Sequence, residues 1–178
     1  MPYLETADVL RHDCAGPGLH ELELSAPQTA AVAAPGQFVH MHVRPVWFGR
    51  RQSSAQAQPL LRRPFSISDA DSNASGSITI LYKVRGAGTQ LLANARPGDR
   101  LDVMGPLGIG FTLPEPPSRP QSQPESQPES QPELRPWRQP TARSPHSLLV
   151  GGGVGIAPLV FLAHALARAG HRVTVFYG

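Results

Sequence analysis

Residues 77–84 read SITILYKV and give the clearest indication of the fold. Apolar side chains recur there at every second position, and the candidates for one buried face are Ile78, Ile80, Tyr82 and Val84. Successive side chains of a strand point to opposite faces, so this period of two predicts a half-buried β-strand. Gly86 and Gly88 follow directly and end the strand, because closely spaced glycines favour a turn.

Further strands are predicted on both sides of this one. Residues 1–46 are predicted to form short strands, among them 19–24 (LHELEL) and 37–43 (QFVHMHV), and residues 61–68 and 100–104 are predicted strands further along the chain. Residues 89–95 are a short helix candidate, with Thr89 at its N-cap. Short strands separated by turn signals, about every 8–12 residues, predict a closed β-barrel.

Two segments interrupt the strand pattern. Residues 44–60 have no period and are rich in Gln, Ser and Ala, which predicts a partly mobile loop. Residues 114–146 contain ten of the 20 prolines, and the tetrad SQPE repeats three times from Ser122. Proline at every fourth residue excludes a helix, so we predict a disordered insertion, with a proline-motif ligand for a partner as the alternative.

Residues 147–178 change to a strand–helix–strand pattern, which normally forms a parallel pair of strands. The strands are 148–150 (LLV) and 172–177 (RVTVFY), and the helix between them starts at Pro158 and ends at Gly170. The uncharged run of residues 147–167 is long enough to span a bilayer. Its glycines and its proline argue against a straight apolar helix.

Composition and charge argue against several classes of function. The net charge is +3, and no stripe of basic and aromatic residues favours nucleic-acid binding. The only cysteine, Cys14, excludes an internal disulfide and fits a reducing, cytoplasmic compartment, and the acidic N-terminus is unlike a signal peptide. No Ser/His/Asp set or carboxylate pair indicates a hydrolase. His40 and His42 share a strand face without a third ligand, so we expect exposed histidines and no metal site.

Residues 62–68 (RRPFSIS) are the most specific candidate for binding chemistry. Arg63 offers a planar fork that suits a diphosphate. Phe65 can lie flat against an aromatic ring, and Ser66 can hydrogen-bond a ring nitrogen. The alternative is a buried edge strand flanked by charge.

Two glycine turns could bind phosphate as well. Residues 86–89 (GAGT) can point the amides of Gly88 and Thr89 at a phosphate, with a plain turn as the alternative. Residues 151–155 (GGGVG) open a helix whose N-terminus suits a phosphate, with close packing of helix on strand as the alternative. An arginine, an amide nest, an aromatic ring and a serine are what a flavin dinucleotide requires, and such a cofactor carries its own chemistry.

Four segments resemble the ferredoxin reductase-like flavoproteins. They are residues 62–68 (RRPFSIS), 81–89 (LYKVRGAGT), 98–111 (GDRLDVMGPLGIGF) and 148–159 (LLVGGGVGIAPL). Within that superfamily, their order and gaps are most similar to the electron-transfer subunit of heteromeric dihydroorotate dehydrogenase. Apart from the insertion, the resemblance runs from about residue 5 to residue 178.

The resemblance implies a six-stranded antiparallel FAD-binding barrel over residues 1–113. The insertion over 114–146 and the start of an NAD-binding α/β domain over 147–178 would follow. The residues implied at FAD are Arg63, Pro64, Phe65, Ser66, Leu81, Tyr82, Lys83, Gly88 and Thr89. Those implied at the nicotinamide dinucleotide are Gly151, Gly152, Gly153 and Gly155.

The resemblance also implies an activity, the transfer of electrons in pyrimidine biosynthesis. Electrons would pass from the FMN of a partner catalytic subunit, through a [2Fe–2S] cluster, to FAD and on to NAD. Phe65 stands where many relatives have Tyr, and the sequence ends at Gly178 without the family's cluster cysteines, so we expect a truncated chain. The alternatives are a reductase subunit of hydrogenase or sulfite reductase type, or an inactive remnant.

Overall fold

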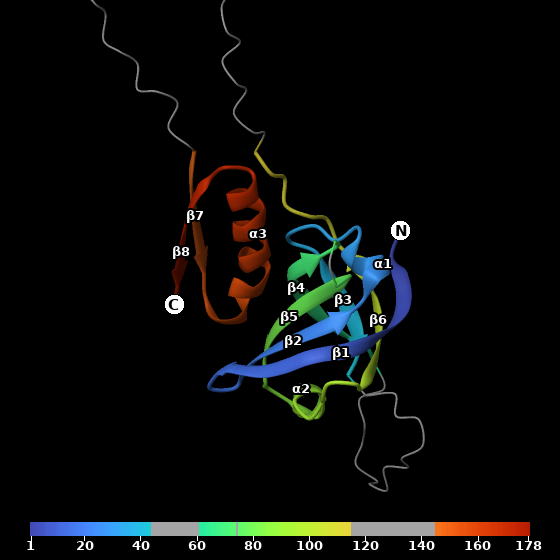
Figure 1. Ribbon diagram of the computed structural model, residues 1–178. Coiled ribbons are helices and arrows are strands. Elements are labelled where there is room, and N and C mark those ends of the chain that lie inside the picture. The colour runs from blue at the N-terminus through green and yellow to red at the C-terminus, as the bar shows by residue number, and fades with distance from the viewer. Residues whose placement is uncertain (44–60, 74, 115–144) are drawn as a thin grey trace, which may run out of the picture.

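The computed structural model describes residues 1–43, 61–73, 75–114 and 145–178. Six antiparallel strands within these ranges close into a barrel (Figure 1). They are β1 (Tyr3–Gly16), β2 (Leu19–Ser25), β3 (Phe38–His42), β4 (Arg63–Asp71), β5 (Ser77–Lys83) and β6 (Arg100–Leu107). Their order is β1-β2-β5-β4-β3-β6, and β6 pairs again with β1, so the barrel has no free edge. The predicted six-stranded antiparallel barrel is confirmed.

The alternating apolar residues of neighbouring strands form the barrel core. Leu22 and Leu24 of β2 lie opposite Ile80 and Ile78 of β5, and all four side chains are fully buried. Burial of each such side chain stabilises the fold by roughly 1.5–3 kcal/mol. The strand predicted over 77–84 is therefore present, with the predicted face inward.

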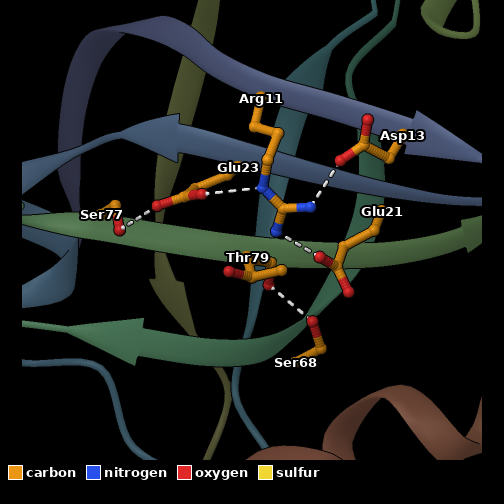
Figure 2. A network of polar contacts seen from close by, with 7 residues as sticks. All are labelled: Arg11, Asp13, Glu21, Glu23, Ser68, Ser77 and Thr79. Atoms are coloured by element: carbon orange, nitrogen blue, oxygen red, sulfur yellow. Dashed lines mark hydrogen bonds and ion pairs between the residues drawn. The ribbon is translucent and has the colours of Figure 1, made fainter. Parts of the chain in front are cut away.

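The outer face of β1 and β2 carries a polar network (Figure 2). The guanidinium of Arg11 contacts the carboxylates of Asp13, Glu21 and Glu23, with 2.6 Å to Asp13 and 3.4 Å to Glu23. Glu23 also accepts a hydrogen bond of 3.0 Å from the Ser77 hydroxyl on β5. These polar side chains give the two strands an outward face that water can solvate, opposite the apolar core.

Two short helices accompany the barrel, α1 (Pro27–Ala30) and α2 (Ala87–Leu92). Leu92 of α2 is fully buried and belongs to the barrel core. The helix begins two residues before the predicted Thr89, so the prediction of Thr89 as N-cap is wrong. Instead, the Thr89 hydroxyl reaches back over the turn and accepts hydrogen bonds from the amides of Arg85 (2.9 Å) and Gly86 (3.2 Å).

A second unit contains β7 (His146–Gly151), the 3₁₀ turn η1 (Gly153–Gly155), α3 (Ile156–Arg168) and β8 (Arg172–Tyr177). β7 and β8 pair in parallel, as predicted. α3 begins at Ile156, two residues before the predicted start, so Pro158 is its third residue. The first four N–H groups of a helix have no partner within it, so the missing N–H of Pro158 costs no helical hydrogen bond. Gly170 follows the helix with a φ of 84°, which confirms the predicted end of the helix.

α3 packs between its own strands and the barrel (Figure 1). Phe161 is 5% exposed and joins the barrel core, and His164 Nδ1 lies 2.9 Å from Asp69 Oδ2 on β4. This packing places the turn at the start of α3 beside β4 and β5. On the opposite face of the β7–β8 pair, Leu148 and Phe176 are exposed.

No helix in the described part of the chain is long and apolar enough to cross a bilayer. The predicted loop over 44–60 and residues 115–144 of the predicted insertion lie outside the described residues. β7 starts at His146, the last residue assigned to that insertion.

Candidate functional site

A cavity of about 280 Å³ lies between β4, β5 and the glycine turn that precedes α3. Three segments distant in sequence line it, and their lining residues are Pro64, Phe65, Ser66, Leu81, Tyr82, Lys83, Arg85, Gly153, Val154 and Ala157. The antiparallel pairing of β4 with β5 joins the first two segments, and the packing of α3 on β4 adds the third.

Two aromatic rings form one wall of the cavity. Phe65 of β4 and Tyr82 of β5 meet edge to face, with ring centroids 5.8 Å apart, and both residues are buried. Burial raises the pKa of Tyr82, so its hydroxyl stays protonated at neutral pH. A rigid, neutral aromatic wall suits a flat apolar ring.

The charge at the cavity is positive. Lys83 and Arg85 line it, and no carboxylate does so among the described residues. The two adjacent arginines at the start of β4, Arg62 just before the strand and Arg63 as its first residue, differ in their partners. Arg62 forms an ion pair with Asp102 of β6, whereas Arg63 is exposed and makes no ion pair in the described part of the chain. Arg63 directly precedes the lining residue Pro64 but does not itself line the cavity.

Gly88 and Thr89 do not line the cavity. They lie in the first turn of α2, where backbone amides have no acceptor within the helix. Arg85, which does line the cavity, is held to Thr89 by the 2.9 Å hydrogen bond from its amide. The turn between β5 and α2 thus connects the cavity to these amides.

The glycine turn before α3 contributes only Gly153 of the four predicted glycines. Gly153 has a φ of 54°, in the left-handed region that favours glycine. At Gly151, a Cβ atom would lie 2.8 Å from Leu159 Cδ1, so this glycine permits close packing of β7 on α3. That close packing is the alternative interpretation of the motif. Gly152 and Gly155 also lie outside the lining, on either side of Gly153 and Val154.

The two histidines of β3, His40 and His42, lie at alternate positions of the strand. His40 packs against Phe38, with ring centroids 5.6 Å apart, and both His40 and His42 are half-buried, where exposed histidines were expected. Nowhere in the described ranges do three or more potential metal ligands gather.

No protein-family model matches the chain. The chain is 36% identical over 172 residues to the dihydroorotate dehydrogenase B (NAD(+)) electron transfer subunit of Desulforamulus reducens, and 37% identical over 174 residues to that of Geobacillus sp. strain WCH70. These alignments cover 97% and 98% of this chain, but 51% and 54% of the relatives. The chain therefore spans about half the length of the curated relatives it matches.

Solved structures that match this chain show which fold it has. An NADH-dependent reduced ferredoxin-NADP oxidoreductase matches with a TM-score of 0.66 and 25% identity, over 97% of this chain and 48% of that one. The ferredoxin reductase in carbazole 1,9a-dioxygenase matches with a TM-score of 0.63 and 24% identity, over 99% of this chain and 44% of that one. The chain has the fold of the ferredoxin reductase-like flavoproteins. Its curated homologues are dihydroorotate dehydrogenase B electron transfer subunits, as the sequence motifs predict.

The cavity includes three lining residues that sequence reasoning missed, Arg85, Val154 and Ala157. Arg85 stands in the quoted segment LYKVRGAGT, and the argument made for Arg63 could have found it. Val154 and Ala157 carry no such signal, because they face the cavity only through the packing of α3 on the barrel.

Proposed function

We propose that this chain binds FAD on its barrel and passes electrons between a partner redox subunit and NAD, in the oxidation of dihydroorotate. The observation that carries this proposal is one cavity whose lining combines residues 64–66, residues 81–83 with Arg85, and Gly153, Val154 and Ala157. The names of the curated homologues support the choice of dihydroorotate as the source of electrons.

The size of the cavity favours a ring system inside it and a diphosphate outside. Ligand pockets usually measure about 300–1,000 Å³, so about 280 Å³ is small for a whole dinucleotide. We assign the isoalloxazine to the wall made by Phe65 and Tyr82. Pro64 and Leu81 complete the apolar lining. The Ser66 hydroxyl has no hydrogen bond within the described residues, and we assign it to the polar edge of the ring.

The diphosphate is then assigned to the margin of the cavity. Arg63 supplies a guanidinium that makes no ion pair with a described residue, and Lys83 and Arg85 add positive charge. The amides of Gly88 and Thr89 receive phosphate oxygens at the start of α2. When bound, FAD supplies the redox chemistry, and these residues bind and orient it.

The glycine turn before α3 is assigned to the nicotinamide dinucleotide. Gly153 and Val154 face the same cavity, and Gly152 and Gly155 flank them. α3 is 13 residues long, so its first turn offers free amides and a positive dipole end. We therefore assign residues 1–113 to a FAD domain and residues 147–178 to part of an NAD domain.

The proposed partner is an FMN-containing dihydroorotate dehydrogenase catalytic subunit, in the cytoplasm. With Cys14 as its one cysteine, this sequence alone cannot supply the four protein ligands of a [2Fe–2S] cluster. We therefore assign no cluster to these residues.

Reconstitution tests the proposal. The purified chain, incubated with FAD and then desalted, should stay yellow and keep a flavin absorption band, and a colourless protein would refute FAD binding. Affinity purification from cells should recover an FMN-bearing subunit. Recovery of a hydrogenase or a ferredoxin in its place would contradict the dihydroorotate assignment alone.

A further inference from the structure

His12 joins three elements of the barrel, although its own strand contributes nothing to the cavity. Its Nδ1 atom lies 2.8 Å from the carbonyl oxygen of Ala95, which follows α2. Its Nε2 atom lies 2.9 Å from the hydroxyl of Tyr82 on β5. One imidazole on β1 therefore connects the segment that follows α2 to Tyr82, one of the two rings of the aromatic wall.

The two partners of His12 determine where its proton lies. A carbonyl oxygen can only accept, so Nδ1 must carry the proton and donate it to Ala95. In the neutral ring, Nε2 is then an acceptor, and the Tyr82 hydroxyl donates to it. Both nitrogens and the hydroxyl are thus satisfied in one arrangement, which holds the Tyr82 ring in a single orientation.

The rings around Tyr82 reinforce this arrangement. His20 of β2 stacks on Tyr82, with centroids 5.4 Å apart and an angle of 23° between the planes, and Phe65 meets Tyr82 edge to face. Burial, with a smaller effect from His12, lowers the pKa of His20. His12, His20, Phe65 and Tyr82 thus form one cluster of contacting rings, with centroid separations of 5.3–6.0 Å.

We propose that His12 is a positioning residue for the dinucleotide: it fixes the spacing between the amides at the start of α2 and the aromatic wall of the cavity. This inference rests on the proposed binding of FAD. A dinucleotide must contact both regions at once, so a site whose two halves are already held in place loses less freedom on binding.

Two substitutions break the hydrogen bond between His12 and Tyr82, one on each side of the bond. His12→Phe keeps a ring but loses both hydrogen bonds, and Tyr82→Phe removes only the hydroxyl. We expect Tyr82→Phe to raise the dissociation constant for FAD about five- to tenfold, the effect of losing one hydrogen bond, and His12→Phe to raise it by at least as much, each with a changed visible circular dichroism of the bound flavin. The double variant should be no weaker than His12→Phe, because both changes break the same bond. Cys14→Ser, on the same strand and exposed, is the matched control.

The outcomes separate this inference from the proposed function. Wild-type affinity in both single variants, or losses that add in the double variant, would overturn the role of His12 while FAD binding stands. A wild-type chain that binds no FAD would refute the proposed function itself. If His12→Phe does not fold, Tyr82→Phe decides alone, because it removes a single oxygen atom, and an unchanged flavin spectrum and affinity would then reject the proposal.

Discussion

Replacing each of two adjacent arginines by alanine should give opposite results. Arg63 is exposed and makes no ion pair with any described residue, so Arg63→Ala should leave stability unchanged and weaken FAD binding. Arg62 is paired with Asp102, so Arg62→Ala should lower stability and leave FAD affinity unchanged. The pair is a matched control in charge, volume and position.

The contacts give the magnitude of each effect. A hydrogen bond between Arg63 and a diphosphate oxygen is charge-assisted and contributes about 1.5–3 kcal/mol, which corresponds to roughly 10- to 150-fold in the dissociation constant. The side chains of Arg62 and Asp102 are 26% and 35% exposed. Loss of this half-buried pair should cost between about 1 kcal/mol, as for an exposed pair, and about 3 kcal/mol, as for a buried one.

Fluorescence titration of the apoprotein with FAD measures the affinity, and urea unfolding of the same samples measures the stability. Because the diphosphate contact is ionic, the difference between wild type and Arg63→Ala should shrink as salt is added. Equal FAD affinity in wild type and Arg63→Ala would refute the assignment of Arg63. A comparable loss of affinity in Arg62→Ala would show that the effect depends on net charge and not on the site.

Three further predictions concern other parts of the structure. Arg85→Ala should weaken FAD binding about tenfold by titration, because Arg85 lines the cavity, and unchanged affinity would remove it from the site. Phe161→Ala should destabilise the packing of α3 on the barrel by about 3–5 kcal/mol and speed proteolysis within residues 147–178, whereas equal cleavage rates would contradict that packing. The lowered pKa of His20 means that the unfolded chain binds the proton more readily, so stability should fall as the pH drops below 6.5. Urea unfolding between pH 8 and 5 checks this, and the same slope in His20→Phe would show that His20 is not responsible.

The strands that sequence reasoning found are those with a regular apolar period. β5 shows the period plainly, and β2 and β3 fall within the predicted ranges. β1 was expected only as part of a region of short strands, yet it runs for 14 residues. Few of its side chains are buried, and an imidazole, His12, faces the aromatic cluster, so no regular pattern shows its length.

The candidate site likewise contains residues that the sequence predicts correctly and residues whose role depends on packing. Residues 64–66 and 81–83 were predicted together, and the pairing of β4 with β5 brings them to one cavity. Gly151 was chosen for the same reason as Gly153, but its space is filled by Leu159. Whether a glycine faces a ligand or a helix depends on packing between distant elements, which a local motif does not reveal.

A crystal structure of the chain loaded with FAD tests the central claim most directly. The account predicts the isoalloxazine against Phe65 and Tyr82, and the diphosphate between Arg63 and the start of α2. A flavin bound elsewhere on the barrel, with the cavity between β4, β5 and the glycine turn filled only by water, would contradict it.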